Sequence, residues 1–484
     1  MRFCGLITLA LALTGGAWAQ GAGPAGNWAG ALHPAGVNLP VVLHVRHVPG
    51  GFSATLDSPT QGAKGLPTTH VVWRGRQLSF DVPSVRGHYH GTLSPDGQTL
   101  KGTWSQGAPL ALDFHRLSTA AAATFERKAT ATALLPARPP VPLAQLGRVL
   151  KTEMAPLRKN SLAPGSGLGL VVAVAYHGQR RIFASGAARP GSIFEIGSVT
   201  KTFTGLILAR MVEQRKVRLG DPVGQFLPPA SVPAAAHGAG ITLGELATQH
   251  SGLPPMPDNF NAASANPYAA YTPALLLSYL RRRGLAHPTG APFVYSNLGY
   301  GLLGYALARA AHTSYAALLR REVTGPLGLH NTVIRLSTAQ RRRLLPGHNA
   351  AGHVVPNWTF TPAFAGAGAL RSTAADLLTY LQANLHPPAA MASAVALQHR
   401  LRAAGPGGMM VGLGWIYIPE SGSYWHNGGT GGYNSFVFFN PRLNLAVVAL
   451  NNQELVGSGR PMLPGQVANN VGALLEGKPA PKIQ

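Results

Sequence analysis

The sequence has almost no cysteine and little negative charge. Its 484 residues include one cysteine, and 16 Asp and Glu stand against 40 Lys and Arg, which gives a formal net charge of +24. The cysteine, Cys4, lies in an N-terminal segment that we expect to be removed. Disulfide bonds and thiol chemistry are therefore excluded for the mature chain.

Long apolar runs are absent after the N-terminus. Residues 1–19 have a basic start, an apolar stretch over 6–13 and the end Ala17-Trp18-Ala19, which is typical of a secretory signal peptide cleaved after Ala19. A buried N-terminal helix is the alternative. No later run is long enough to span a bilayer. We expect a protein that is exported, either periplasmic or secreted, without a transmembrane segment.

The basic residues are scattered and form no nucleic-acid motif. The triplets Arg281-Arg282-Arg283 and Arg341-Arg342-Arg343 each fall late in an expected helix, where cations suit the helix dipole. We therefore expect no nucleic-acid partner. Two explanations of the charge stay open: contact with an anionic cell-envelope polymer, and an acid habitat, in which few carboxylates would be lost to protonation.

Residues 20–117 predict a small all-β domain. Strand patterns at 41–48, 52–56, 70–73, 78–82, 89–93 and 99–104 alternate with turn residues, a spacing that suits an antiparallel barrel or sandwich. The stretch 56–62 resembles β-rich modules that precede the catalytic domain of some exported bacterial hydrolases, and it assigns no function. Such a domain could bind the cell wall, cover the active site or only stabilise the protein.

One pair of histidines raises the question of a metal. His88 and His90 would share a strand face. Two histidines without a third ligand are more often surface residues than a metal site, so we expect no metal and no cofactor.

Residues 118–145 predict a linker, because a run of small residues leads into the proline-rich stretch 136–142. The domain 146–484 then begins with a helix from 142 to about 159 and strands at 168–176 and 179–185. Helices follow at 298–311, 315–323, 338–345, 374–385 and 467–475, with strands at 410–418, 433–439 and 445–450. Thr242 and Thr272 have the spacing of helix caps. Strands at both ends predict an α+β domain with one sheet built from both termini and a helical subdomain between them.

A serine and a lysine stand three residues apart in Ser198-Val-Thr-Lys201. Residues at this spacing are neighbours on a helix. A serine hydroxyl needs a base to become a nucleophile, and a desolvated, neutral lysine can supply it. Taken alone, the pair could equally be a helix cap and a solvent-facing lysine. Apolar residues recur at helical spacing over 203–212 and predict a helix with one buried face.

Two further stretches bear on the chemistry. Tyr295-Ser-Asn297 stands at an expected helix start, and His426-Asn-Gly428 opens a glycine-rich segment over 425–433. Alone, the first could be a cap beside a packed ring and the second a loop without chemistry. Glycines entering a strand usually mark a bulge or a close backbone approach.

Together and in this order, the three elements resemble those of the exported serine hydrolases that include class C β-lactamases, D-alanyl-D-alanine carboxypeptidases (penicillin-binding proteins) and related esterases. Supporting stretches are 221–228, 246–254 and 368–374. The resemblance covers residues 146–475. It implies a β-lactamase/transpeptidase-like domain, in which an antiparallel sheet is flanked by helices and joined by a helical subdomain.

The resemblance also implies roles. Ser198 would attack the substrate carbonyl and form an acyl-enzyme, and Lys201 and Tyr295 would share the proton transfers. Asn297 would hold the Lys201 side chain and contact the substrate. The backbone N–H groups of Ser198 and Gly429 would form the oxyanion hole.

The third element departs from the β-lactamase pattern. His426 stands where those enzymes usually have the lysine of Lys-Thr-Gly, and it would contact the substrate together with Gly428, whose missing side chain would leave room for the acyl group. A histidine titrates near neutral pH. We therefore expect poor β-lactam hydrolysis at pH 7, and binding of a carboxylate substrate that strengthens as the pH falls from about 8 to 5.

The substrate expected from the resemblance is a D-Ala-D-Ala-type peptide of peptidoglycan or a small-molecule mimic of it. A carboxylesterase or D-aminopeptidase using the same site is the alternative within the enzymes. A penicillin-binding or wall-binding protein without turnover is the alternative outside them. The sequence leaves the oligomeric state open.

Overall fold

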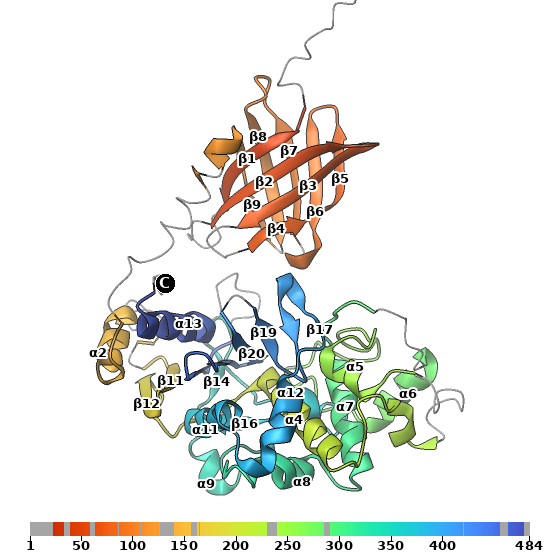
Figure 1. Ribbon diagram of the computed structural model, residues 1–484, viewed down its shortest axis with the longest axis vertical. Coiled ribbons are helices and arrows are strands. Elements are labelled where there is room, and N and C mark those ends of the chain that lie inside the picture. Colours follow the sequence, from red (N-terminus) through yellow and green to blue (C-terminus); the bar gives the residue numbers. More distant parts are fainter. Residues whose placement is uncertain are drawn as a thin grey trace, which may run out of the picture. The chain divides into compact units, whose positions relative to one another are not determined.

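The computed structural model divides into two compact units, residues 1–130 and 131–484, each described here by itself (Figure 1). The expected signal peptide with Cys4, and most of the expected linker, lie outside the described residues, and the expected domain boundaries stay a prediction. The structure describes the residues 23–32, 39–58, 63–85, 87–106, 108–122, 124–125, 140–155, 162–163, 165–229, 240–284, 291–419, 421–454 and 463–478.

The first unit is an antiparallel, nearly closed β-barrel. Its strand order is β4-β3-β2-β1-β10-β8-β7-β6-β5, with β9 paired to β8, and β3 and β5 contact each other where the sheet almost closes. The strands are β1 (Gly26–Leu32), β2 (Leu39–Val48), β3 (Gly51–Ser58), β4 (Ala63–Pro67), β5 (Thr69–Arg74), β6 (Gln77–Val82), β7 (Gly87–Leu93), β8 (Thr99–Gln106), β9 (Ala108–Ala111) and β10 (Phe114–Leu117), and the 3-10 turn η3 (Pro83–Val85) joins β6 to β7.

Alternation along the strands fills the barrel with aromatic and aliphatic side chains. In β7 every second residue is buried, as a period of two requires when one face packs inward. Trp28, Phe80, Tyr89 and Phe114 are completely buried. The six strands expected from the sequence are confirmed, and a barrel is observed in place of a sandwich. The six expected strands leave out β1 and the short strands β4, β9 and β10.

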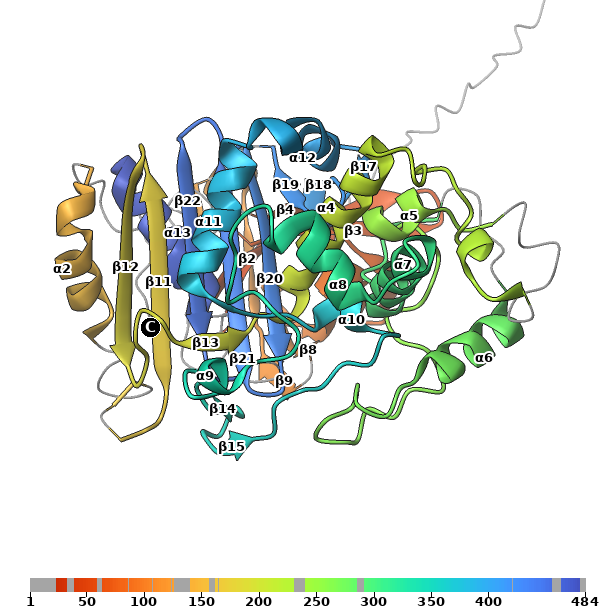
Figure 2. The same ribbon diagram turned by 90° about the horizontal axis from the view of Figure 1, so that it is seen from below.

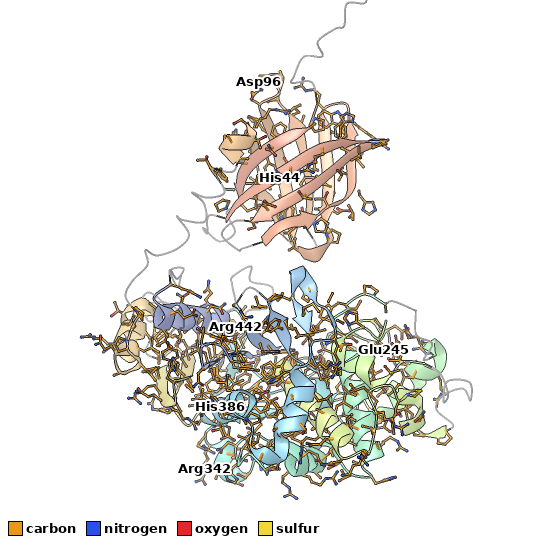
Figure 3. All side chains as sticks on the ribbon, viewed as in Figure 1. His44, Asp96, Glu245, Arg342, His386 and Arg442 are labelled. Atoms are coloured by element: carbon orange, nitrogen blue, oxygen red, sulfur yellow. The ribbon has the colours of Figure 1, made fainter. Side chains whose placement is uncertain are left out.

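The polar face of the barrel carries several histidines. His44, labelled in Figure 3, lies 2.7 Å from Asn27 and 3.3 Å from Asp57. His88 and His90 do share an exposed face of β7, and His88 pairs with Asp81 at 2.6 Å. Among the described residues, no group of three His, Cys, Asp or Glu side chains could hold a metal ion.

The second unit is built on an eight-stranded antiparallel sheet in the order β12-β11-β22-β21-β20-β19-β18-β17, accompanied by two small sheets. Its strands are β11 (Gly169–Tyr176), β12 (Gln179–Gly186), β13 (Ile193–Glu195), β14 (Gly347–His348), β15 (Val354–Val355), β16 (Arg371–Thr373), β17 (Ala403–Ala404), β18 (Met410–Val411), β19 (Ile416–Ile418), β20 (Ser423–Thr430), β21 (Tyr433–Asn440) and β22 (Leu445–Asn451). Because β11 pairs with β22, the expectation of one sheet built from both termini is confirmed.

Helices cover both faces of this sheet, and the helical subdomain is inserted between β12 and β17. The helices are α2 (Leu143–Glu153), α4 (Thr200–Glu213), α5 (Leu243–Thr248), α6 (Pro273–Arg283), α7 (Asn297–Ala310), α8 (Tyr315–Leu319), α9 (Thr338–Arg341), α10 (Ala365–Gly368), α11 (Ala374–Leu385), α12 (Ala392–His399) and α13 (Leu463–Glu476). The shorter turns are η4 (Gly197–Val199), η5 (Val223–Phe226), η8 (Arg320–Thr324), η9 (Ala389–Met391) and η10 (Pro406–Gly408). The caps expected at Thr242 and Thr272 are confirmed, and Glu245 (Figure 3) completes a capping box with Thr242.

Two cores lie on the two sides of the sheet. Alternate residues of β11 point to opposite faces: Leu170 and Val172 pack with α2 and α13, whereas Val171 and Ala173 pack with α4 and α11. Figure 2 looks onto the α4 and α11 side. In both outer layers the apolar face of a helix covers the sheet, so both faces of the central strands are dry.

The structure corrects three details of the sequence prediction. Helix α4 is buried on nearly every side instead of one, because it lies between the sheet and the helical subdomain. Segment 410–418 is a hairpin of β18 and β19, turning through Gly414 at a φ of +84°. Helix α9 ends at Arg341 because Leu345 leaves to donate a hydrogen bond to Ile193. Helix α2 ends at Glu153, and the end expected near residue 159 lies outside the described residues.

Glycines allow α7 and α10 to approach each other. A Cβ added to Gly304 would lie 2.8 Å from the Cα of Gly366, and one added to Gly301 would lie 2.4 Å from the Ala363 carbonyl oxygen. Contacts this short are not sustained by real Cβ atoms. The helix α10 is therefore pressed against the middle of the subdomain, beside α4.

We expect Gly304→Ala to lower the free energy of unfolding by about 1–3 kcal/mol, because the extra methyl group overpacks this contact. Gly220→Ala is the matched control, since nothing lies within 4 Å of a Cβ added there. Its effect should stay within about 0.5 kcal/mol. Urea denaturation of both variants measures the difference, and equal stabilities would contradict the packing argument.

Candidate active site

The turn η4 places Ser198 between β13 and α4. Gly197 precedes it with a φ of +48°, a conformation that glycine adopts without a steric penalty. A Cβ at Gly197 would lie 2.7 Å from the backbone nitrogen of Gly429, so the turn is pressed against β20. Ser198 is the only partly exposed residue in the otherwise buried run 192–209, and it lines a small cavity.

Lys201 lies in the first turn of α4 and is completely buried. Its Nζ lies 2.9 Å from Ser198 Oγ, 2.7 Å from Asn297 Oδ1 and 2.9 Å from the carbonyl oxygen of Ala367. Burial lowers the pKa of Lys201 well below its usual value, because a charged amine loses its hydration there. The environment therefore favours the neutral amine.

The contacts of Lys201 also orient that neutral amine. A neutral amine has two N–H donors and one lone pair. The Asn297 side-chain oxygen and the Ala367 carbonyl oxygen can only accept hydrogen bonds, so they take up both N–H groups. The lone pair is then left for the Ser198 hydroxyl, which is the arrangement required of a general base.

Sequence reasoning missed the Ala367 carbonyl group, because a backbone acceptor leaves no residue type to recognise. The only signal was the run of small residues over 365–369. These small residues let α10 come close to α4, so that two consecutive carbonyl groups of α10 accept hydrogen bonds from α4. The Gly366 carbonyl oxygen accepts one from the Thr204 hydroxyl at 2.7 Å, and the Ala367 carbonyl oxygen accepts one from Lys201 Nζ at 2.9 Å.

Tyr295 and Asn297 flank the N-cap of α7. The cap residue, Ser296, accepts a hydrogen bond from Gly299 N–H, and its own N–H donates to the Gln249 side chain at 2.8 Å. This fixes the residues on either side. The Ser198 hydroxyl lies near enough to the Tyr295 phenol to offset part of the rise in the pKa of that phenol, and Lys201 Nζ lies 4.8 Å from the centre of the Tyr295 ring.

Burial raises the pKa of Tyr295 above its usual value of 10. The phenol therefore keeps its proton at neutral pH and can donate it. Lys201 and Tyr295 thus have pKa values displaced in ways that suit opposite tasks, the amine as proton acceptor and the phenol as proton donor.

His426 on β20 is buried and neutral. Its Nδ1 lies 2.6 Å from the Asn427 carbonyl oxygen and donates to it, and its ring centre lies 6.3 Å from that of Tyr295. Burial lowers the pKa of His426 to about 3. The expectation that this histidine titrates between pH 5 and 8 is therefore wrong, because the sequence does not reveal its burial.

Gly428 serves a different purpose from the one expected. A Cβ there would lie 2.1 Å from the Ile196 carbonyl oxygen and 2.8 Å from the Ser198 backbone nitrogen. The space left by its missing side chain is thus filled by the serine turn instead of an acyl group. Gly429, the next residue, is exposed.

Two small cavities are lined in part by the predicted site residues. The first, which we call the serine cavity, is lined by Gly197, Ser198, Tyr268, Asn297, Trp358, Phe360, Ala367, Gly368 and Gly429. The second, the histidine cavity, is lined by Ala247, Thr248, Gln249, Phe293, Tyr295, Tyr300, Val411, Gly412, Gly414, Trp415, Ile416 and His426.

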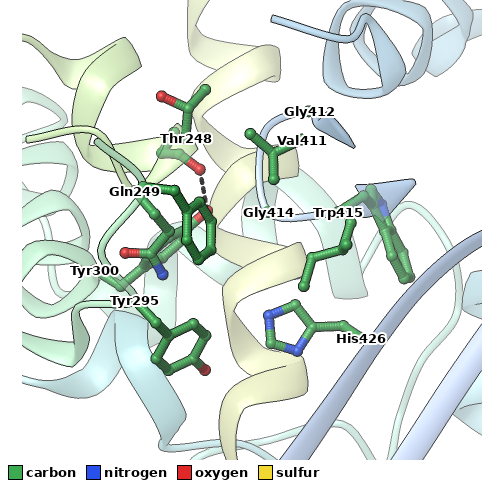
Figure 4. A pocket seen from close by; sticks show the side chains of 12 residues that line it. Thr248, Gln249, Tyr295, Tyr300, Val411, Gly412, Gly414, Trp415 and His426 are labelled. Carbon is green, nitrogen blue, oxygen red and sulfur yellow. Dashed lines mark hydrogen bonds between the residues drawn. The ribbon is translucent and has the colours of Figure 1, made fainter. Parts of the chain in front are cut away.

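Figure 4 shows the histidine cavity, with the Tyr295 phenol and the His426 imidazole at the same side of it. Among the described residues, those that line either cavity include no Asp, Glu, Lys or Arg. The site residues predicted from the sequence thus gather around Ser198, but no fixed cation accompanies them in the lining.

The Beta-lactamase family model matches residues 158–468. The chain is 31% identical over 308 residues to the D-alanyl-D-alanine-carboxypeptidase/endopeptidase AmpH of Escherichia coli K12. This match covers 58% of this chain and 78% of that protein. It is 28% identical over 340 residues to a β-lactamase of Pseudomonas fluorescens, and this match covers 60% of this chain and 90% of that protein. The match to the family model begins after the barrel.

Solved structures show the same fold. A class C β-lactamase aligns with a TM-score of 0.58 at 22% identity and covers 68% of this chain and 98% of that one. The class C β-lactamase of Rhodobacter sphaeroides aligns with a TM-score of 0.55 at 22% identity, and the alignment covers 69% of this chain and 98% of that one. The expected fold of the second unit is confirmed.

Because His426 stays neutral, we expect binding of a carboxylate ligand to change less than about threefold between pH 5 and 8, the range where an ordinary histidine titrates. Calorimetry with benzylpenicillin and the Ser198→Ala variant, which cannot be acylated, measures this. His426→Gln is the control and should give the same flat profile. Binding that tightens about tenfold on acidification, and loses this dependence in His426→Gln, would show a titrating histidine.

Proposed function

The chain belongs to the β-lactamase family of serine hydrolases, and on that basis we propose that it hydrolyses an amide or ester through an acyl-enzyme on Ser198. The observation that carries this proposal is the buried Lys201 amine, whose two N–H groups meet acceptors while its third contact is the Ser198 hydroxyl at 2.9 Å. The N-terminal sequence pattern supports export, to the periplasm or the medium.

In the acylation step, Lys201 accepts the proton of Ser198 as Oγ bonds to the substrate carbonyl carbon. Negative charge develops on the carbonyl oxygen, and the backbone N–H groups of Ser198 and Gly429 are the donors we assign to it. Such donors are typically worth about 10²–10³ in rate. The bond to the leaving nitrogen or oxygen breaks as that atom receives a proton from the Tyr295 phenol.

Deacylation reverses the proton movements. The Tyr295 phenolate accepts a proton from water as the water attacks the ester carbonyl of the acyl-enzyme, and the Lys201 ammonium group returns its proton to Ser198 when the bond to Oγ breaks. Lys201 and Tyr295 return to their starting states, neutral amine and neutral phenol. The products are a carboxylic acid and an amine or alcohol.

For the substrate, we propose a D-alanyl-D-alanine-type peptide, as the name of the E. coli relative suggests. A carboxylesterase or D-aminopeptidase activity is the second candidate. It is favoured by the neutral His426, whose pKa of about 3 leaves no fixed cation there for a substrate carboxylate. Contact with the anionic cell envelope remains a proposal that rests on the net charge of +24.

Mass mapping after incubation with a labelled penicillin and with nitrophenyl acetate tests the chemistry. We expect a covalent adduct on the peptide that contains Ser198, absent in Ser198→Ala and present in Ser53→Ala, an exposed barrel residue. Penicillin labelling with slow release would indicate a wall-peptide enzyme, and rapid ester turnover without labelling an esterase. Labelling without any turnover would indicate a binding protein, and activity that survives Ser198→Ala would overturn the proposal.

The role of Lys201 as a neutral base predicts a pH effect. Activity should rise with pH as the amine loses its proton, and Asn297→Asp should move this rise to higher pH, because a carboxylate 2.7 Å from Nζ would favour the charged amine. The pH profile of kcat/KM measures the shift. Asn444→Asp, in the turn between β21 and β22, is the control and should leave the profile in place.

A further inference from the structure

The serine cavity is walled by three aromatic rings that come from two distant segments. Tyr268 stacks on Phe360 with ring centres 4.4 Å apart and lies 5.2 Å from Trp358. The ring centres of Trp358 and Phe360 lie 6.3 Å apart. These rings line the cavity beside Ser198 and Asn297, and the described residues of its lining include no Asp, Glu, Lys or Arg.

The backbone of Trp358 is held from both sides by one buried ion pair. Its carbonyl oxygen accepts a hydrogen bond from Arg371 Nη2 at 2.6 Å, and its N–H donates to Glu195 Oε2 at 3.4 Å. The same Arg371 nitrogen lies 3.0 Å from Glu195 Oε1. The side chains of Glu195 and Arg371 are 4% and 13% exposed, so water screens this pair little.

This ion pair is part of the strand that leads to the nucleophile. Glu195 of β13 is paired in register with Arg371 of β16, and Ser198 follows Glu195 by three residues. One pair of side chains therefore links the serine turn to the tryptophan that walls its cavity.

The other end of the wall is fixed by the segment that carries Tyr268. The Trp358 indole N–H donates to the Ala265 carbonyl oxygen at 3.1 Å, and the N–H of Thr359 donates to the Asn266 side chain at 2.8 Å. A Cβ added to Gly431 would lie 2.7 Å from the indole nitrogen, so the ring lies against the turn between β20 and β21. Trp358 is thus held at its backbone, its ring edge and its ring face.

The side of the substrate that meets this wall follows from the proton donor. Tyr295 must reach the leaving atom, and it lines the histidine cavity. The leaving group therefore extends toward the histidine cavity. The acyl group, which remains bonded to Ser198, extends to the other side, into the serine cavity.

We propose, on the premise of the acyl-enzyme function above, that Trp358 determines acyl-group specificity and that Glu195 and Arg371 are its positioning residues. The acyl group selected is uncharged and carries a planar or aromatic portion that packs against the wall formed by Tyr268, Trp358 and Phe360, whose rings already contact one another. The selection concerns the acyl group alone and leaves the leaving group free.

Two esters with the same leaving group test this, nitrophenyl acetate and nitrophenyl phenylacetate. We expect the wild-type chain to prefer the phenylacetyl ester. Trp358→Ala should lower kcat/KM for that ester by about 10–100-fold, the range for losing apolar contacts in a specificity pocket. It should change kcat/KM for the acetyl ester less than about threefold, while Trp358→Phe should retain most of the preference.

The role of Glu195 is tested by a double-mutant cycle. Glu195→Gln should reduce the preference for the phenylacetyl ester several-fold, mainly through KM, and should have no further effect on the preference in the Trp358→Ala background. Asp376→Asn, which changes another buried carboxylate of the same unit, should leave the preference unchanged. Equal losses for both esters, or an undiminished effect of Glu195→Gln without the tryptophan, would overturn the proposal.

A failure of the proposed function would look different. Ester turnover would then survive Ser198→Ala. Binding of phenylacetamide and acetamide to Ser198→Ala tests the wall without any turnover. We expect phenylacetamide to bind more tightly, and to lose at least about tenfold in affinity with Trp358→Ala, by the same loss of apolar contacts. Equal binding of the two amides would overturn the specificity assignment.

Discussion

The burial of one amine organises the second unit. Lys201 is completely inside the protein, and an ammonium group there would pay a large desolvation cost unless it were paired with an anion. Within the part of the chain that the structure describes, none of its close contacts is an anion: they are a hydroxyl, an amide oxygen and a backbone carbonyl oxygen. This surrounding makes the neutral amine the stable species and aims it at Ser198, so the reactivity of the hydroxyl is a property of how α4 is packed.

That packing depends on backbones that come unusually close. The turn before α4 is pressed onto β20 through Gly197 and Gly428, and α10 reaches α4 because Gly304 and Gly366 have no side chains in the way. A further contact of this kind is made at Gly205, where a Cβ would lie 2.0 Å from the Leu413 carbonyl oxygen. The glycines thus determine where the carbonyl and N–H groups of the site lie, although none of them takes part in proton transfer.

The sequence predicted what is encoded locally. The Ser198-to-Lys201 spacing, the Tyr295-to-Asn297 spacing and the strands at both ends could be read because each is a short pattern of residue types. Three features could not be predicted in this way: the Ala367 acceptor, the purpose of Gly428 and the burial of His426. Each of them depends on which other segment of the chain packs against the residue. The hairpin of β18 and β19 shows the same limit. An apolar run predicted one strand, but a turn arises where Gly414 passes the Lys201 backbone.

The scarcity of carboxylates does not by itself make the folded chain acid-stable. Burial lowers the pKa of His399 to about 4 and that of His426 to about 3, while an unfolded chain protonates histidine near pH 6.5. Both groups therefore favour folding above that pH, and this contribution is lost progressively as the pH falls toward their folded values. Of the two explanations for the basic charge, the acid habitat receives no support from these histidines.

The pairing of β11 with β22 has a consequence for synthesis. These neighbours in the sheet are separated by more than 250 residues along the chain, and contacts of such long range are slow to form. A ribosome adding about 5–20 residues per second needs tens of seconds between them. Throughout that interval the hairpin of β11 and β12 has an unpaired apolar edge, which is a site for aggregation or chaperone capture. A transcript truncated before Leu445 would leave that edge open permanently.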